Sequence, residues 1–257
     1  MNPKEQYHLP IFEALQSTFA KSISLDIQNN YLANFKEIKK WICLSDYSIG
    51  GKKNDVITFS FLPYVVDIEE LSKIIKNIAP KEIKHTKEID SKFINFLKDS
   101  FTLNISIVLE NHNYLFGKDF DGVIEILRNT LKKLIEDVDG WNLARPYMKE
   151  QNEKIRKKAK RVLRLVEHKK KIEIIKNLFL ITLMGGYFLS FIANETNAEK
   201  VTWFSDRDAI NDIEDYFATD IFSISFYEYL IGEKCEFYSA PAASADIEWY
   251  GELIKIP

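Results

Sequence analysis

The apolar residues of this chain follow two periods, one typical of strands and the other of helices. Early in the chain, segments rich in β-branched and aromatic residues predict strands at residues 41–49, 56–66 and 101–110. A Gly-Gly pair lies in the connection at residues 50–55, so the first two strands are expected to form a hairpin. The sheet is therefore expected to begin with antiparallel strands.

Later segments alternate between helical and strand-like periods. Antiparallel strands followed by strands that alternate with helices indicate a mixed sheet covered by helices. The predicted helices cover residues 10–38, 91–98, 119–138, 146–193, 211–229 and 246–256, with a short helix after Asp67, and the later strands cover residues 201–205 and 235–238.

One apolar segment raises the question of a membrane span. Residues 178–193 contain no charged side chain, but they are shorter than the roughly 18 residues that a spanning helix needs. A Gly-Gly pair lies in the middle of this segment, and Lys176 comes shortly before it. The pattern favours a buried core helix over a membrane span.

The composition is that of a soluble globular protein with one large domain or two small ones. The chain has 257 residues, of which 46% are hydrophobic and 28% charged, and its net charge of −3 names no partner. Its two cysteines, Cys43 and Cys235, fall in apolar runs, and with four scattered histidines they give no zinc-binding spacing. No secretory leader is recognisable at residues 1–4, so a cytoplasmic, reduced protein is expected.

Two apolar runs within the predicted strand regions end in the dipeptide Ser-Asp, at Asp46 and at Asp206. Mg²⁺ and Mn²⁺ prefer oxygen ligands, so carboxylates at two strand ends are suited to hold such a cation. The alternative is structural, because an aspartate after a strand often forms a turn or caps a helix. Asp206 or Asp208 would then cap the helix that is predicted to begin near Asn211.

A resemblance to a known family is carried by three short stretches, Leu44–Gly50 (LSDYSIG), Pro80–Lys84 (PKEIK) and Trp203–Asp206 (WFSD). They resemble an uncharacterised bacterial family of ribonuclease-H-like proteins, in which the opening strand ends in an aspartate-containing loop. The resemblance implies a ribonuclease-H-like mixed sheet, an antiparallel hairpin plus parallel strands flanked by helices, within a domain of residues 41–257. A helical insertion at about 146–195 and a separate helical segment at 1–40 lie outside it.

The resemblance also implies a site in which carboxylates hold Mg²⁺ or Mn²⁺ ions that promote cleavage of a phosphodiester. The residues implied are the ligands Asp46, Glu82, Asp206 and Asp208, with Lys84 neutralising the scissile phosphate and His85 assisting proton transfer. The alternative for residues 81–88 is a solvated, charged face.

The chain departs from the family at two places. Tyr47 follows Asp46 where the family usually has glutamate, and residues 253–257 lack the aspartate that the family places in its last helix. Asp246, Glu248 or Glu252 would have to replace that ligand, and nothing in the sequence selects among them.

Residues 154–171 form a strongly basic segment, with ten Lys or Arg residues and one acid, Glu167, so its charge is 10 − 1 = +9. Apolar residues recur in it at helical spacing, which predicts a helix with one apolar face and an otherwise cationic surface. Such a surface suits a nucleic-acid backbone, and the candidate contacts are Arg156, Lys157, Lys160, Arg161 and Arg164. A membrane surface, the protein's own acidic surface and plain solvation are the alternatives, and the lack of interleaved aromatics argues against base stacking.

These features lead to two principal functional hypotheses. The first is a divalent-metal-dependent nuclease, or another phosphodiester-processing protein, that acts on nucleic acid; the family resemblance adds phage defence or mobile-element conflict as its setting. The second is a non-catalytic subunit on the same scaffold, which binds nucleic acid or a protein partner and forms an oligomer. A peripheral membrane protein that uses residues 154–193 is a third interpretation.

Overall fold

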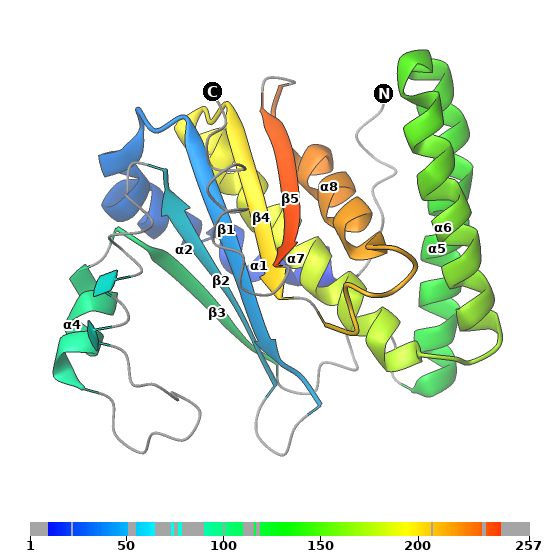
Figure 1. Ribbon diagram of the computed structural model, residues 1–257, viewed down its shortest axis with the longest axis horizontal. Helices are drawn as coiled ribbons and strands as arrows, with labels where there is room; N and C mark the ends of the chain where they lie inside the picture. Colours follow the sequence, from blue (N-terminus) through cyan, green and yellow to red (C-terminus); the bar gives the residue numbers. More distant parts are fainter. Residues whose placement is uncertain are drawn as a thin grey trace.

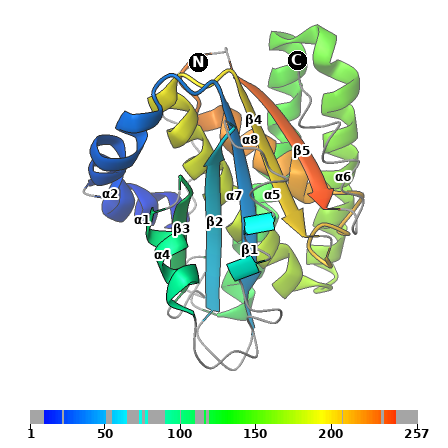
Figure 2. The ribbon, with the colours of Figure 1, turned by 60° about the vertical axis from the view of Figure 1, so that its left-hand side comes forward.

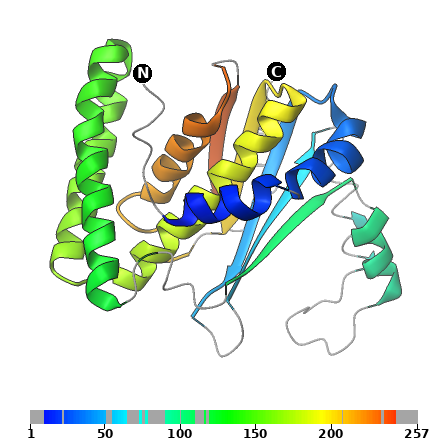
Figure 3. The ribbon, with the colours of Figure 1, turned by 180° about the vertical axis from the view of Figure 1, so that it is seen from behind.

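The computed structural model describes residues 10–21, 23–50, 55–64, 73–74, 77–78, 90–99, 101–109, 116, 119–206, 208–232 and 235–242. Within them, five strands form one open mixed sheet with helices packed against one face (Figure 1). When the molecule is seen from behind, these helices lie in front of the strands (Figure 3). The chain is thus an α/β protein, as its sequence predicts.

The sheet has the strand order β3-β2-β1-β4-β5 (Figure 2). Its strands are β1 (Lys40–Ser48), β2 (Asp55–Pro63), β3 (Leu103–Leu109), β4 (Lys200–Asp206) and β5 (Glu236–Ala242). β2 is antiparallel to both β1 and β3, whereas β4 runs parallel to β1 and β5 runs parallel to β4. The predicted combination of an opening hairpin with later parallel strands is confirmed.

Within the described part of the chain, the helices lie before and between these strands. Those before β1 are short: α1 (Pro10–Thr18), the 3₁₀ turns η1 (Phe19–Lys21) and η3 (Leu32–Phe35), α2 (Ile23–Asp26) and the π-helix η2 (Ile27–Tyr31). The later ones are α4 (Ser91–Asp99), α5 (Phe120–Ala144), the 3₁₀ turn η6 (Pro146–Met148), α6 (Lys149–Glu167), α7 (Ile172–Thr196) and α8 (Phe217–Tyr229).

The alternation of side chains along β1 separates the two faces of the sheet. Cys43 and Ser45 are buried, while Leu44 between them is 41% exposed. Ser45 pairs with Phe59 of β2, whose ring lies 5.8 Å from that of Phe188 on α7. Odd-numbered positions of β1 therefore face the helices, and Leu44 and the next even position face away from them.

Helix α7 is the central helix of the core. A Cβ atom added to Gly185 would lie 2.4 Å from the Phe222 ring of α8, and one added to Gly186 would lie 2.6 Å from Cβ of Ser225. The Gly-Gly pair therefore lets α8 pack closely on α7. In the part of the chain that the structure describes, α7 is the single helix long and apolar enough to cross a membrane, and 78% of its apolar window is buried inside the protein. The predicted buried core helix is confirmed.

The N-terminal segment packs onto the same core as the sheet. The ring of Phe19 meets those of Phe188 and Phe191 on α7 edge to face, with centroids 4.9 and 5.3 Å apart. The segment is helical as predicted, but it is divided into short α, π and 3₁₀ pieces. The short helix predicted after Asp67 is described only at residues 73–74 and 77–78, which are helical, and residues 246–256 lie outside the described part.

One predicted helix start is wrong and one predicted helical region contains a break, and left-handed residues explain both. The long helical region at 146–193 is two helices, because Lys169 (φ 53°) and Lys171 (φ 54°) reverse the chain between α6 and α7. The helix predicted from Asn211 begins only at Phe217, because residues 214–216 all have positive φ. Lys and Glu seldom adopt this conformation, and neither break contains the glycine that usually marks a helix end. The sequence therefore gives no signal for either break.

Helices α5 and α6 form a hairpin that lies beside the sheet (Figure 1). Asp119 caps α5, since its carboxylate accepts a hydrogen bond of 2.8 Å from the backbone N–H of Gly122. Pro146 disfavours helical backbone at Arg145, and α5 ends directly before that residue. The basic segment of the sequence is thus the second arm of a helical hairpin.

Candidate functional site

The two Ser-Asp strand ends lie side by side in the sheet. β1 and β4 are parallel neighbours, and their register pairs Ser45 with Ser205. Asp46 and Asp206 are the next residues on each strand, and neighbouring strands are about 4.8 Å apart. The backbones of the two aspartates therefore meet at one carboxyl end of the parallel pair, which is where open α/β sheets bind ligands.

Asp46 presents its carboxylate to solvent on the face of the sheet opposite the helices. It lies within β1, where its backbone pairs with Thr58 of β2, so it does not cap a helix. Among the described residues, no side chain forms a hydrogen bond or an ion pair with it. An exposed, unpaired carboxylate at a strand end is available as an oxygen ligand. Asp206 is described through its backbone, at the end of β4.

Asp208 has a structural role in the loop that follows β4. Its Oδ1 accepts hydrogen bonds from the backbone N–H groups of Ile210 (2.9 Å) and Asn211 (3.1 Å). Its Oδ2 accepts a hydrogen bond from the hydroxyl of Tyr47 on β1. With both oxygens engaged, this geometry favours the turn-forming role that the sequence leaves open for Asp208, over a role as metal ligand.

The serines of the two Ser-Asp pairs belong to the buried side of the same strand ends. Ser45 Oγ accepts a hydrogen bond of 3.0 Å from the indole N–H of Trp203. Ser205 Oγ accepts one of 3.1 Å from the side-chain amide of Asn211. These bonds connect β1 to β4 and β4 to the following loop, so they fix the strand ends that carry the two aspartates.

The remaining candidates for the carboxylate site fall outside the described residues. These are Glu82, Lys84 and His85, and the possible replacements Asp246, Glu248 and Glu252. Among the described side chains, no group of three or more His, Cys, Asp or Glu residues is placed to hold a metal ion. The described geometry thus brings together the strand ends of Asp46 and Asp206. Asp208, by contrast, has a structural role in the loop after β4.

The basic helix α6 divides its charged residues between two roles. Lys157, Lys160, Arg161 and Arg164 are exposed on the face that points away from α5. Arg156, by contrast, has a side chain only 19% exposed, and its guanidinium pairs with Asp139 of α5 and, at 3.4 Å, with Glu153. Four of the five predicted phosphate contacts are accessible, and Arg156 is used inside the hairpin.

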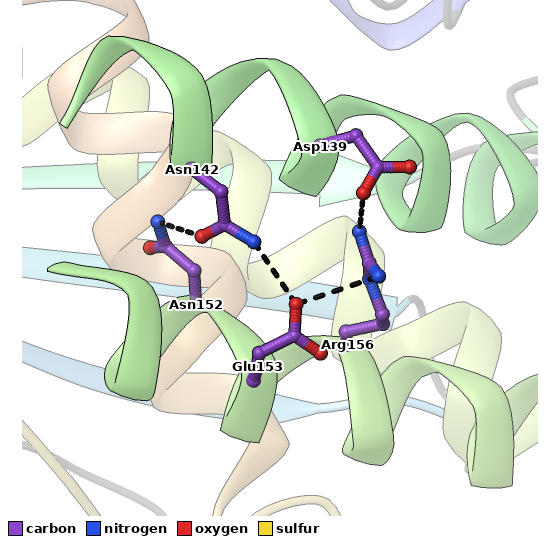
Figure 4. Close-up of polar contacts among 5 residues, drawn as sticks. All are labelled: Asp139, Asn142, Asn152, Glu153 and Arg156. Atoms are coloured by element: carbon purple, nitrogen blue, oxygen red, sulfur yellow. Dashed lines mark hydrogen bonds and ion pairs between the residues drawn. The ribbon is translucent and has the colours of Figure 1, made fainter. Parts of the chain in front are cut away.

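A network of polar side chains joins the two arms of the hairpin near its connection (Figure 4). The amide of Asn142 donates to Glu153 (2.9 Å) and its carbonyl oxygen accepts from Asn152 (3.0 Å). Arg156 completes the network with bonds to Glu153 and Asp139. These contacts hold α6 in a defined rotation about its axis, in which Lys157, Lys160, Arg161 and Arg164 are exposed.

Helix α6 is also tied to the body of the protein by charged contacts, of the kind that the sequence left open as pairing with the protein's own acidic surface. Lys158 Nζ lies 2.8 Å from Asp220 of α8, and both side chains are largely buried. Burial raises the pKa of the Asp220 carboxyl, while the hydrogen bond from Lys158 acts in the opposite direction. The partners lie 62 positions apart in the chain, so no local pattern could have paired them.

Comparisons with known proteins add no relative to this picture. Neither the protein-family models, nor the curated proteins, nor the solved structures that were searched give a match to the chain. The features of the molecule that bear on its function are therefore the sheet register, the chemistry of the named side chains and the charge of α6.

Proposed function

We propose that this protein is a divalent-metal-dependent nuclease, or a related phosphodiester-processing enzyme, of ribonuclease-H-like fold. The observation that carries the proposal is the parallel register of β1 and β4, which sets Asp46 and Asp206 side by side at one end of the sheet. Two carboxylates delivered by neighbouring strand ends are the start of an oxygen-ligand site for Mg²⁺ or Mn²⁺.

The fold class of the proposal is supported by strand order and strand direction. Three antiparallel strands come first in the chain, and β4 and β5 then extend the sheet in parallel from β1. The opening strand and the later parallel strand each deliver one aspartate, which is the pattern that the family resemblance implies. Both cysteines are free and buried, which agrees with the proposed cytoplasmic location.

The candidate carboxylates differ in how well they are suited to bind a hard cation. Asp46 fits, because its carboxylate is exposed and has no partner among the described side chains. Asp206 would share the cation from β4, and Glu82, outside the described residues, would be a third ligand. A bound Mg²⁺ or Mn²⁺ would supply water activation and stabilisation of the leaving oxygen.

The chain's own contribution is to hold the two strand ends rigidly. Tyr47 follows Asp46 and donates its hydroxyl hydrogen to Asp208, two residues after Asp206. This bond joins β1 to the loop after β4 and limits relative movement of the two aspartates. Preorganised ligands of this kind lose little conformational entropy when a cation or a phosphate binds.

Hydrolysis of labelled DNA, RNA and DNA–RNA hybrids in the presence of Mg²⁺ or Mn²⁺ tests the proposal. We expect cleavage by the wild type and a loss of about 100-fold or more in Asp46→Asn, which removes a charged ligand but keeps its shape. Glu37→Gln removes the same charge from an exposed carboxylate outside the strands and is the matched control. Equal cleavage by wild type and Asp46→Asn would contradict the proposed site.

A second candidate function is favoured by the engagement of Asp208 and by the lack of a three-carboxylate group among the described residues. In that case the same scaffold is a non-catalytic subunit that binds nucleic acid or a protein partner. It predicts that no substrate is cleaved, that Mn²⁺ does not bind, and that the protein forms an oligomer or a complex, as measured by light scattering.

A further inference from the structure

The outward face of α6 is a continuous cationic surface, which we call the α6 basic face. Lys157, Lys160, Arg161 and Arg164 lie at relative positions i, i+3, i+4 and i+7, so they share one side of the helix. All four side chains are exposed. With a rise of 1.5 Å per residue, the face extends over about 10 Å along the helix axis.

Most of the charge on this face is free to meet an outside partner. Within the described part of the chain, no side chain forms an ion pair with Lys157, Lys160 or Arg164. The adjacent Arg156 and Lys158 show the contrast, because each forms an ion pair within the protein, with Asp139 and Asp220 respectively. The basic segment of the sequence therefore separates into cations that hold the hairpin and cations that face solvent.

The chemistry of the α6 basic face points to a polyanionic backbone and away from a bilayer. Helices that bind a membrane surface insert an apolar side, but the apolar side of α6 is used against the rest of the protein. Its residues Ile155, Ala159, Val162 and Val166 are at most 9% exposed. An interfacial helix would have nothing left to insert.

The same face lacks the groups that recognise single strands or particular bases. Single-strand binders stack bases on aromatic side chains, and none lies within α6. Lys and Arg side chains at helical spacing, with no aromatic platform, match the regularly spaced phosphates of a duplex. Recognition of this kind depends on charge and shape and not on sequence.

The α6 basic face is physically connected to the candidate carboxylate site. Arg161 bonds Glu214 at 3.3 Å, and Glu214 belongs to the loop that leaves β4 after Asp206. The same loop contains Asp208, which bonds Tyr47 on β1. A nucleic acid held on α6 would therefore lie against the loop that borders the two aspartates.

We propose that the α6 basic face binds the phosphate backbone of double-stranded nucleic acid without regard to sequence. This inference rests on the proposed function, since it takes nucleic acid as the substrate of the carboxylate site. The three cations of this face without an ion pair, Lys157, Lys160 and Arg164, correspond to about three neutralised phosphates, since Arg161 already pairs with Glu214. The logarithm of the association constant is then expected to fall with the logarithm of the salt concentration with a slope of about −2.7, from about −0.9 for each phosphate.

The experiment measures binding of a fluorescent 20-base-pair duplex by anisotropy, in EDTA and over a range of NaCl concentrations, in the Asp46→Asn background. Adding Lys157→Gln and Arg164→Gln is expected to reduce the slope by about two phosphate contacts, to about −0.9, and to weaken binding about tenfold or more near 0.1 M salt. Lys36→Gln with Lys98→Gln removes the same charge from exposed positions on other elements and is expected to leave slope and affinity unchanged.

Three results would overturn the inference: an unchanged slope in the Lys157→Gln, Arg164→Gln protein, equal affinity for a single strand of the same length, or a wild-type slope weaker than about −1. Loss of binding to anionic vesicles, instead of to the duplex, in the same variant would also overturn it. Because EDTA prevents hydrolysis, the outcome is separate from the proposed activity. Duplex binding without cleavage would refute the enzyme alone, and cleavage with an unchanged slope would refute the α6 basic face alone.

Discussion

At the scale of single residues, the Ser-Asp pair of β1 places neighbouring side chains in different environments. Ser45 faces the helices and accepts a hydrogen bond from the indole of Trp203, whereas Asp46, one position on, faces solvent. The alternation of a strand produces this division without any further device. The buried serine fixes the strand end, and the exposed aspartate is left for chemistry.

Replacing Ser45 with alanine is expected to destabilise the fold by about 1–3 kcal/mol. The buried indole N–H of Trp203 would lose its acceptor, and an unsatisfied buried donor costs about that amount. Urea unfolding of the two proteins measures the difference. Ser48→Ala, at an exposed position of the same strand, is the control and is expected to change stability by less than about 0.5 kcal/mol.

Single residues also show which parts of the candidate site could be predicted from the sequence. The local amino-acid sequence at the strand ends was enough to select Asp46 and Asp206, because strand patterns depend on neighbouring residues. The role of Asp208 needed the structure, since its partner Tyr47 is 161 positions away. Arg156 belongs to the same class: its charge is visible in the sequence, but its burial against Asp139 is not.

At the scale of elements, the close approach of α7 and α8 depends on the two glycines of α7. Gly185→Ala is expected to destabilise the protein by about 2 kcal/mol or more, because the new Cβ would lie 2.4 Å from the Phe222 ring and 2.8 Å from the Phe59 ring. Gly140→Ala on α5 is the matched substitution, because nothing lies within 4 Å of its Cβ position. It is expected to stabilise by about 0.5–1 kcal/mol, and thermal unfolding of both variants checks the pair.

The stability of the fold is expected to depend on pH through Glu228 of α8. Burial, and then the charge of Asp137 on α5, raise the pKa of Glu228 to about 7. A carboxyl whose pKa is raised in the folded state binds its proton more tightly there, so stability is highest below its ordinary pKa of 4.5 and is lost as the pH rises through about 7. Asp137 also pairs with Lys133.

Glu228→Gln removes this titration and is expected to make the protein more stable at pH 8 by on the order of 2 kcal/mol, with little change near pH 4.5. Urea unfolding at the two pH values measures it. Glu136→Gln, at an exposed site on α5, is the control. The same pH dependence in wild type and Glu228→Gln would show that Glu228 is not the group responsible.

Element boundaries show where prediction from the sequence stops. Strand and helix periods were enough to predict all five strands and the long helices, because burial of one face repeats within each element. The breaks at Lys169, Lys171 and residues 214–216 were not predictable, because ordinary residues take left-handed backbone there. Asp208 stabilises the turn that precedes the second break, through its bonds to the backbone N–H groups of Ile210 and Asn211.

At the scale of the whole molecule, the fold brings three features of the sequence to one region. The parallel pair β1 and β4 delivers the two aspartates, the loop after β4 connects to β1 through Tyr47, and Glu214 of that loop bonds α6. The strand order was predictable in outline, since antiparallel strands preceded helix-separated ones. The position of the hairpin beside the sheet was not, because it depends on contacts such as Lys158 with Asp220.

Binding of Mn²⁺, followed by electron paramagnetic resonance, tests the central claim most directly: Asp46 and Asp206 form one cation site. The account predicts that the wild type binds Mn²⁺ and that Asp46→Asn and Asp206→Asn each weaken binding about tenfold or more, since each removes a charged oxygen ligand. Glu37→Gln is expected to bind as the wild type does. Identical Mn²⁺ binding by all four proteins, or none by the wild type, would contradict it.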